Sequence, residues 1–212
     1  MRHLRIIIAI GIFMVLAFIT AACGGASNNS GGAPSKTTAP AAVTGSSSSE
    51  NPRVLVAYYS ASGNTKKVAE VIAKDLGGTL FEMVPAQQYT SEDLNYRDTN
   101  SRVVKEHNDP NRHVALAQAK PDNFDTYDVI FVAYPIWWRE AAWVVNDFIK
   151  ENNFTGKTVI PVATSTSSPL ADSGEKLKAM AGTGNWLEGI RFAGGVSDND
   201  VSTWIHTLQL KK

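Results

Sequence analysis

An abrupt change of residue type near the start of the folded region constrains this 212-residue chain more than any other feature. Val54 to Tyr59 is an apolar, β-branched and aromatic run, which predicts a buried strand. The run stops at small hydroxyl residues, and apolar residues then recur at helical spacing from Val68 to Leu76. The sequence therefore predicts a strand, a short loop, and a helix whose N-terminus points back at the loop.

The predicted loop carries the groups of an oxyanion site. Gly63 allows backbone N–H groups to approach an anion without a Cβ in the way, and the first helical turn adds two lysines that oppose the helix dipole unless an anion lies in front of them. In the alternative interpretation, Ser62 or Asn64 is an ordinary N-cap and the lysines point into water. Neither a P-loop nor the spaced-glycine dinucleotide motif is present. The hydroxyl and amide side chains belong to Ser60, Ser62, Asn64 and Thr65.

Two motifs together resemble a known family. Ser60-Ala61-Ser62-Gly63-Asn64-Thr65 resembles the phosphate loop of the flavodoxins, and Tyr134-Pro135-Ile136-Trp137-Trp138 is similar to a segment of a flavodoxin-like family. The resemblance extends from Arg53 to the C-terminus. It implies an α/β, three-layer flavodoxin-like fold with a five-stranded parallel sheet of order 2-1-3-4-5, an insertion before the third strand, and FMN as the cofactor.

The resemblance also implies which residues bind FMN. It places the phosphate at Ser60, Ser62, Gly63, Asn64 and Thr65, the ring at Pro135, Ile136, Trp137 and Trp138, and the ring edge at Thr164, Ser165 and Thr166. The chain departs from the family at Arg139, and in the third loop at Thr166, Ser168 and Pro169, where relatives carry glycines. Because the third loop has no aromatic residue, we expect one side of the ring to stay open.

The rest of the chain alternates between strand and helix patterns, which is typical of a parallel, doubly wound sheet. Predicted strands cover 79–85, 127–134, 158–164 and 186–192, and predicted helices cover 101–107, 113–119, 143–149, 173–181 and 200–210. The polar segment 86–123 is long for a loop, which favours a cap over a site. Within it, Glu106, Asp109 and Arg112 are expected to form a local ion-pair cluster.

The first 52 residues differ in kind from the rest. Two arginines and an apolar run predict a signal peptide over residues 1–22, and Ala21-Ala22-Cys23 is similar to the lipobox of bacterial lipoproteins. Residues 23–52 then form a polar linker behind a lipidated Cys23, and the folded domain covers 53–212. We therefore expect export and a lipid anchor on the outer face of the cytoplasmic membrane. In the alternative, the protein is secreted without lipid.

The composition of the chain argues against several classes of function but leaves three of them open. The net charge is zero, so no nucleic-acid partner is expected, and a single cysteine excludes an internal disulfide. No histidine has a partner at the spacing of a hydrolase. Three functions stay open: an electron-transfer protein with a redox partner protein, an FMN-dependent reductase of quinones or similar acceptors, and a flavin-binding lipoprotein without turnover.

Overall fold

The computed structural model describes residues 51–210, so the predicted signal peptide, Cys23 and most of the predicted linker lie outside the described residues. No helix in the described part is long and apolar enough to cross a membrane. The elements are β1 (Val54–Tyr58), α1 (Asn64–Leu76), β2 (Thr79–Glu82), α2 (Arg102–Asn108), η1 (Phe124–Thr126), β3 (Val129–Trp137), β4 (Glu140–Ala141), η2 (Trp143–Val145), α3 (Asn146–Glu151), β5 (Thr158–Ser165), α4 (Ser173–Ala181), β6 (Asn185–Trp186), β7 (Ile190–Ala193) and α5 (Asp198–Thr207).

The sheet confirms the predicted fold class and strand order. Its strands run β2-β1-β3-β5-β6, with β7 also paired to β5, and all of these pairs are parallel. Counting β6 and β7 as one interrupted strand, this is the order 2-1-3-4-5. The small β4 pairs with β3 in the antiparallel sense and lies off this path.

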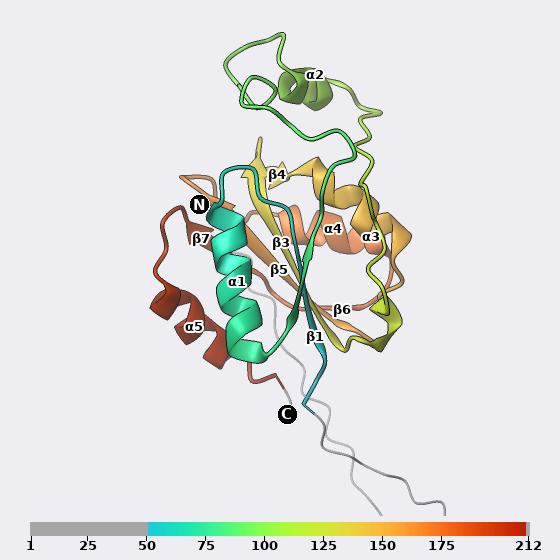
Figure 1. Ribbon diagram of the computed structural model, residues 1–212, viewed down its shortest axis with the longest axis vertical. Helices are drawn as coiled ribbons and strands as arrows, with labels where there is room; N and C mark the ends of the chain where they lie inside the picture. The colour runs from blue at the N-terminus through green and yellow to red at the C-terminus, as the bar shows by residue number, and fades with distance from the viewer. Residues whose placement is uncertain (1–50, 211–212) are drawn as a thin grey trace, which may run out of the picture. The chain divides into compact units, whose positions relative to one another are not determined.

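Successive residues of each central strand pack into different cores. In β1, Val56 belongs to the cluster with α1 and α5, whereas Leu55 belongs to the cluster with α3 and α4. Figure 1 shows the resulting layers, with α1 and α5 on one face of the sheet and α3 and α4 on the other. A strand covered on both faces explains the unbroken apolar run that begins at Val129.

The predicted last strand is interrupted beside Pro161. Val159 pairs with Trp186, but Val162 pairs with Ile190, so the outer strand carries one extra residue over this interval. A proline has no N–H to donate to a neighbouring strand, which favours a bulge at this position. Gly189 fits the bulge because a Cβ there would lie 2.4 Å from the Pro161 carbonyl oxygen.

The insertion at 86–123 differs from the prediction in two ways. Its first helix is confirmed as α2, with the Ser101 hydroxyl accepting from the Val104 N–H, but residues 113–119 form no helix. They run as extended chain, and Leu116 forms an isolated antiparallel bridge with Pro85. In Figure 1, α2 and the chain around it lie beyond the end of the sheet that carries β4, and the last part of the insertion runs back along the side of the domain.

The predicted ion-pair cluster inside the insertion is wrong. Glu106 pairs with Arg102 at 2.7 Å, whereas Arg112 pairs with Glu140 at 2.8 Å. Asp109 forms neither bond, because its carboxylate accepts from the Asn111 N–H. Arg112 therefore attaches the insertion to β4, whereas Glu106 pairs inside the insertion with Arg102.

Candidate functional site

The first loop presents backbone N–H groups at an uncapped helix end. Gly63 occupies the N-cap of α1 with φ 86°, and no side chain caps the helix. This conformation is left-handed, which glycine adopts without strain. The interpretation of Ser62 or Asn64 as an ordinary N-cap is therefore wrong. The first N–H groups of α1 are left for an anion.

Hydrogen bonds between neighbouring residues hold the shape of this loop. The Gly63 N–H donates to the Ser60 hydroxyl at 3.1 Å, and the Asn64 amide donates to the Ser62 hydroxyl at 3.1 Å. Thr65 is buried, and its hydroxyl lies 2.7 Å from the hydroxyl of Thr164 in the third loop. The first and third loops are thus tied together through one buried contact.

The two lysines at the start of α1 have different surroundings. Lys67 lies 3.3 Å from the carboxylate of Asp198 and donates to the carbonyl oxygen of Val196. Its charge is therefore offset by the start of α5, and it is weaker support for an anion than the sequence suggested. Lys66 is exposed.

The second loop is a hairpin, which the sequence did not predict. β3 continues through Trp137, and Ile136 and Trp137 pair with Ala141 and Glu140 of β4. The two residues of the turn, Trp138 and Arg139, have φ of 46° and 68°. Positive φ at both positions is characteristic of a type I′ turn. The site is therefore built on a rigid extension of the central strand.

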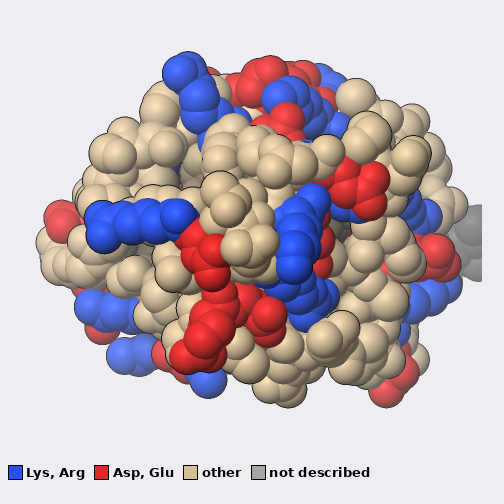
Figure 2. Space-filling view, turned by 90° about the horizontal axis from the view of Figure 1, so that it is seen from above, with Lys and Arg blue, Asp and Glu red and all other residues tan. Residues whose placement is uncertain are grey.

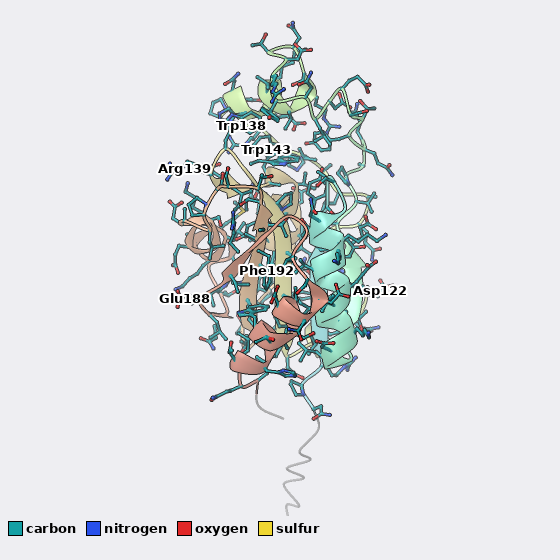
Figure 3. The ribbon with its side chains drawn as sticks, turned by 90° about the vertical axis from the view of Figure 1, so that its left-hand side faces the viewer. Asp122, Trp138, Arg139, Trp143, Glu188 and Phe192 are labelled. Atoms are coloured by element: carbon teal, nitrogen blue, oxygen red, sulfur yellow. The ribbon has the colours of Figure 1, made fainter. Side chains whose placement is uncertain are left out.

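The neighbouring tryptophans differ in burial, although both contact the ring of Trp143. Trp137 is half-buried and makes edge contacts with Tyr59, Tyr89 and Trp143 at centroid distances of 5.6, 5.7 and 5.0 Å. Trp138 is 37% exposed. Figure 3 shows Trp138 and Trp143 together at the end of the sheet, below the insertion, with Arg139 turned outward.

Trp138 also has a partner that sequence reasoning missed. The imidazole ring of His107 stacks on it at 4.4 Å with an interplanar angle of 14°. The sequence analysis did not predict this contact, because nothing in the spacing relates His107 of α2 to the hairpin. This contact joins the insertion to the predicted ring-binding segment.

The third loop is held from behind by Arg191 of β7, another residue that the sequence analysis did not identify. Its Nε donates to the Ser165 hydroxyl at 2.9 Å and to the Ser168 carbonyl at 3.1 Å, and a terminal nitrogen donates to the Thr166 carbonyl at 3.3 Å. The Ser165 hydroxyl also donates to the Ser168 carbonyl. The loop keeps a defined shape without the glycines of its relatives.

The three loops surround a cavity of about 580 Å³. This volume is within the range of small-molecule and cofactor sites. Of the twelve predicted residues, nine line the cavity: Ser62, Asn64, Pro135, Ile136, Trp137, Trp138, Thr164, Ser165 and Thr166. Gly63 and Thr65 lie in the adjoining helix start, and Ser60 lines a neighbouring cavity of about 240 Å³.

The remaining wall contains residues that were not predicted individually. Leu94, Tyr96 and Val103 come from the insertion, which accords with its expected role as a cap over a site. Tyr96 is 65% exposed, and it adds an aromatic ring from the insertion to the cavity wall. Sequence reasoning also missed Ser167, Ser168 and Gly194.

None of the described residues that line the cavity is charged, and buried tyrosines lie in the surrounding core. Burial raises the pKa of Tyr59 and of Tyr89, and for Tyr89 a hydrogen bond to the Glu106 carboxylate raises it further. Burial also raises the pKa of Tyr134 to about 12. On the face that carries the insertion, basic and acidic side chains are interspersed (Figure 2). Residues 51–210 contain no cluster of side chains suited to a metal ion.

This arrangement can accept one elongated ligand. The uncapped start of α1 suits an oxyanion, the tryptophan hairpin suits a flat ring, and the third loop suits a polar edge. A plain hydrophobic ligand would leave the helix N–H groups and the serine-rich loop without partners.

Comparisons with known proteins agree with the architecture. A crystal structure from Bacteroides eggerthii, of a protein classed as a flavoprotein, is 39% identical, with a TM-score of 0.69 over 76% of this chain and 100% of that chain. A similarly classed protein from Bacteroides uniformis is 37% identical, with a TM-score of 0.69 over 74% and 99% of the two chains.

A more distant relative has the same fold. The structure of a flavoprotein from Lactobacillus acidophilus in complex with FMN is 21% identical, with a TM-score of 0.50 over 73% of this chain and 99% of that chain. A search of curated proteins found no match. The sequence profile described as flavodoxin matches residues 53–208, which is most of the chain, and this protein therefore belongs to the flavodoxin family.

Proposed function

We propose that this protein binds FMN in the cavity between its three loops and transfers electrons through it. The observation that carries the proposal is the convergence of an uncapped helix N-terminus, a tryptophan hairpin and a polar loop on one cavity. FMN has an oxyanion, a flat ring and a hydrogen-bonding edge in the same order. When bound, it supplies the redox chemistry that no side chain here provides.

Each loop has a separate task in this proposal. Ser62, Asn64 and the first N–H groups of α1 hold the phosphate, because they are the polar groups at the helix end. Trp138 stacks on the ring, since its ring is partly exposed in the cavity wall, whereas Trp137 supports the wall from within the aromatic cluster. The third loop orients the ring edge.

Titration of FMN and riboflavin into the purified protein tests the phosphate assignment. Loss of one hydrogen bond to a charged group costs about 1.5–3 kcal/mol, so Ser62→Ala should weaken FMN binding roughly ten- to a hundred-fold. Riboflavin has no phosphate and should bind wild type and variant alike. Equal weakening for both ligands would contradict the assignment.

A matched pair of substitutions tests the ring assignment. Trp138→Leu should weaken both flavins and, because it removes only the ring contacts with His107 and Trp143, lower the unfolding temperature of the free protein less than Trp137→Leu does. Trp137→Leu should lower the unfolding temperature of the free protein, because it removes edge contacts with three aromatic rings. If Trp137→Leu alone weakened flavin binding, the two roles would be reversed.

A flavodoxin-like electron carrier is the first candidate activity and an FMN-dependent reductase of quinones or similar acceptors is the second. The second is favoured by the exposed rings of Trp138 and Tyr96 at the rim, which leave an approach for another planar molecule. Anaerobic mixing of the FMN-loaded protein with NADH or NADPH separates the two. Rapid bleaching of the flavin supports a reductase, and no bleaching supports a carrier that needs a protein donor.

We further propose that Cys23 carries the lipid anchor that holds the domain outside the cytoplasmic membrane. The support is the sequence before residue 53 alone: a basic and apolar leader, Ala21-Ala22-Cys23, and a polar linker. Cys23→Ser should move the protein from the membrane fraction to the soluble fraction. A variant that stayed in the membrane fraction would show that the apolar leader is the anchor.

A further inference from the structure

The guanidinium group of Arg191 donates hydrogen bonds to three oxygen atoms of the third loop. These are the Ser165 hydroxyl and the carbonyl oxygens of Thr166 and Ser168. Within residues 51–210, the backbone N–H groups of Thr166, Ser167 and Ser168 donate to no other backbone or side-chain group. Three backbone donors of the loop beside the cavity thus have no partner within the described residues, while three of its oxygens accept from Arg191.

The charge of Arg191 is not offset locally. Every contact of its guanidinium is to a neutral oxygen, and no carboxylate within residues 51–210 lies within 4.0 Å of it. Arg191 is also partly buried, so water screens its charge less than that of an exposed arginine. A positive charge thus lies behind the loop whose residues Thr166, Ser167 and Ser168 line one wall of the cavity.

We infer that Arg191 is a positioning residue that makes this wall electropositive and so strengthens the binding of reduced FMN relative to oxidised FMN. The inference rests on the proposed function, with the ring edge against the third loop. Two electrons and one proton convert oxidised FMN to its anionic reduced form, and the added negative charge lies at the pyrimidine edge. A cation behind that edge favours the reduced form and raises the midpoint potential of the bound flavin.

The forked shape of the guanidinium matters as well as its charge. One planar group reaches three acceptors on two sides of the loop, which a single ammonium cannot do in the same geometry. Charge and shape therefore have separable effects. Charge should act on the difference between the two redox states, and shape should act on the affinity for both.

Three variants of the full-length protein separate these effects. Arg191→Gln removes the charge but keeps a donor, Arg191→Lys keeps the charge but loses the fork, and Arg53→Gln removes an exposed arginine at the start of β1, at the opposite end of the strand from the cavity. The measurements are the dissociation constant of oxidised FMN, by fluorescence, and the midpoint potential, by anaerobic titration with dithionite and a reference dye.

We expect Arg191→Gln to lower the ratio of reduced to oxidised affinity about tenfold, which is about 30 mV for a two-electron couple. Arg191→Lys should keep the wild-type ratio within about twofold while weakening both forms, and Arg53→Gln should match wild type. An unchanged potential in Arg191→Gln would overturn the inference while the proposed function stood. If wild type bound no FMN, both would fall.

Discussion

At the scale of single residues, Arg139 is one of the two residues of the hairpin turn with a left-handed backbone. It has φ 68°, an exposed side chain and no hydrogen-bond partner within the described residues, since Glu140 pairs with Arg112 and Lys176 instead. A left-handed conformation costs a residue with a Cβ about 1–2 kcal/mol. The cost is borne at a turn that holds Trp138 in the cavity wall.

Arg139→Gly should therefore stabilise the protein. Relief of the strain exceeds the extra chain entropy that glycine has in the unfolded state, about 0.5–1 kcal/mol, so we expect a net gain of about 0.5–1 kcal/mol. For a domain of this size, that raises the unfolding temperature by about 1–4 °C. Arg97→Gly is the control, because Arg97 is exposed and has no positive φ. Equal shifts for both variants would contradict the strain argument.

Site residues could be predicted from the sequence where they lie next to a recognisable strand or motif in the chain. Ser62 and Asn64 were predicted because they follow an apolar run that predicts a strand, and Trp138 because its segment resembles one of a flavodoxin-like family. Arg191 and His107 could not be predicted, because their partners lie far along the chain and nothing in their own surroundings indicates the contact. The roles of such residues depend on long-range contacts that the local sequence pattern does not indicate.

At the scale of elements, the insertion depends on the Glu106 carboxylate. One oxygen accepts from the Tyr89 hydroxyl at 2.5 Å and from the Trp143 indole at 2.8 Å, while the other pairs with Arg102. Arg102 also lies 4.0 Å over the ring of Tyr89. α2, the segment before it, and η2 of the main domain therefore meet at one side chain.

Glu106→Gln should loosen the insertion without unfolding the sheet. A glutamine has one acceptor and one donor end, so either Arg102 or the Tyr89 and Trp143 pair would face an N–H group. We expect a loss of about 1.5–3 kcal/mol in local stability, seen as faster amide exchange at the Val103 N–H, which donates to Asp93. Amides of β3 should exchange at the wild-type rate.

Glu92→Gln is the matched control, because Glu92 is an exposed carboxylate of the same insertion. Its amides should exchange as in wild type. If both variants loosened the insertion equally, the effect would come from net charge and not from the Glu106 contacts. Weaker flavin binding in Glu106→Gln alone would follow from the position of Leu94, Tyr96 and Val103 in the cavity wall.

The elements themselves show why the main sheet was predicted better than the insertion. Strands buried on both faces can be recognised in the sequence by their continuous apolar runs. The helix α4 was also predicted correctly, since it begins and ends at the predicted residues 173 and 181. Residues 113–119 have a weak helical pattern, but the bridge of Leu116 to Pro85 and the bond from its N–H to Asp147 hold them extended. The tertiary contacts outweigh a marginal propensity.

At the scale of the whole molecule, folding desolvates four tyrosines on both faces of the sheet. Burial is the main cause in each case: it raises the pKa of Tyr58 and of Tyr134 to about 12, and it raises the pKa of Tyr59 and of Tyr89 as well. A tyrosine in the unfolded chain ionises near pH 10. Folding and proton uptake are therefore linked in alkaline solution.

The linkage predicts alkaline destabilisation. Above about pH 10 the unfolded chain loses these protons while the native state keeps them, so the unfolded state binds fewer protons and the free energy of unfolding falls as the pH rises. Each such tyrosine contributes a slope of about 1.4 kcal/mol per pH unit until the pH reaches its folded pKa. Below about pH 9 the four together should contribute no slope.

Urea unfolding at several pH values between 8 and 11 measures this slope, and Tyr134→Phe isolates one contribution. The variant loses the hydrogen bond to Ser173, so it should be less stable than wild type near pH 8. Its stability should then fall less steeply above pH 10, by about 1.4 kcal/mol per pH unit, because one ionising group is gone. Parallel curves for wild type and Tyr134→Phe would mean that burial of Tyr134 does not govern the alkaline limit, and that the loss of stability has another source.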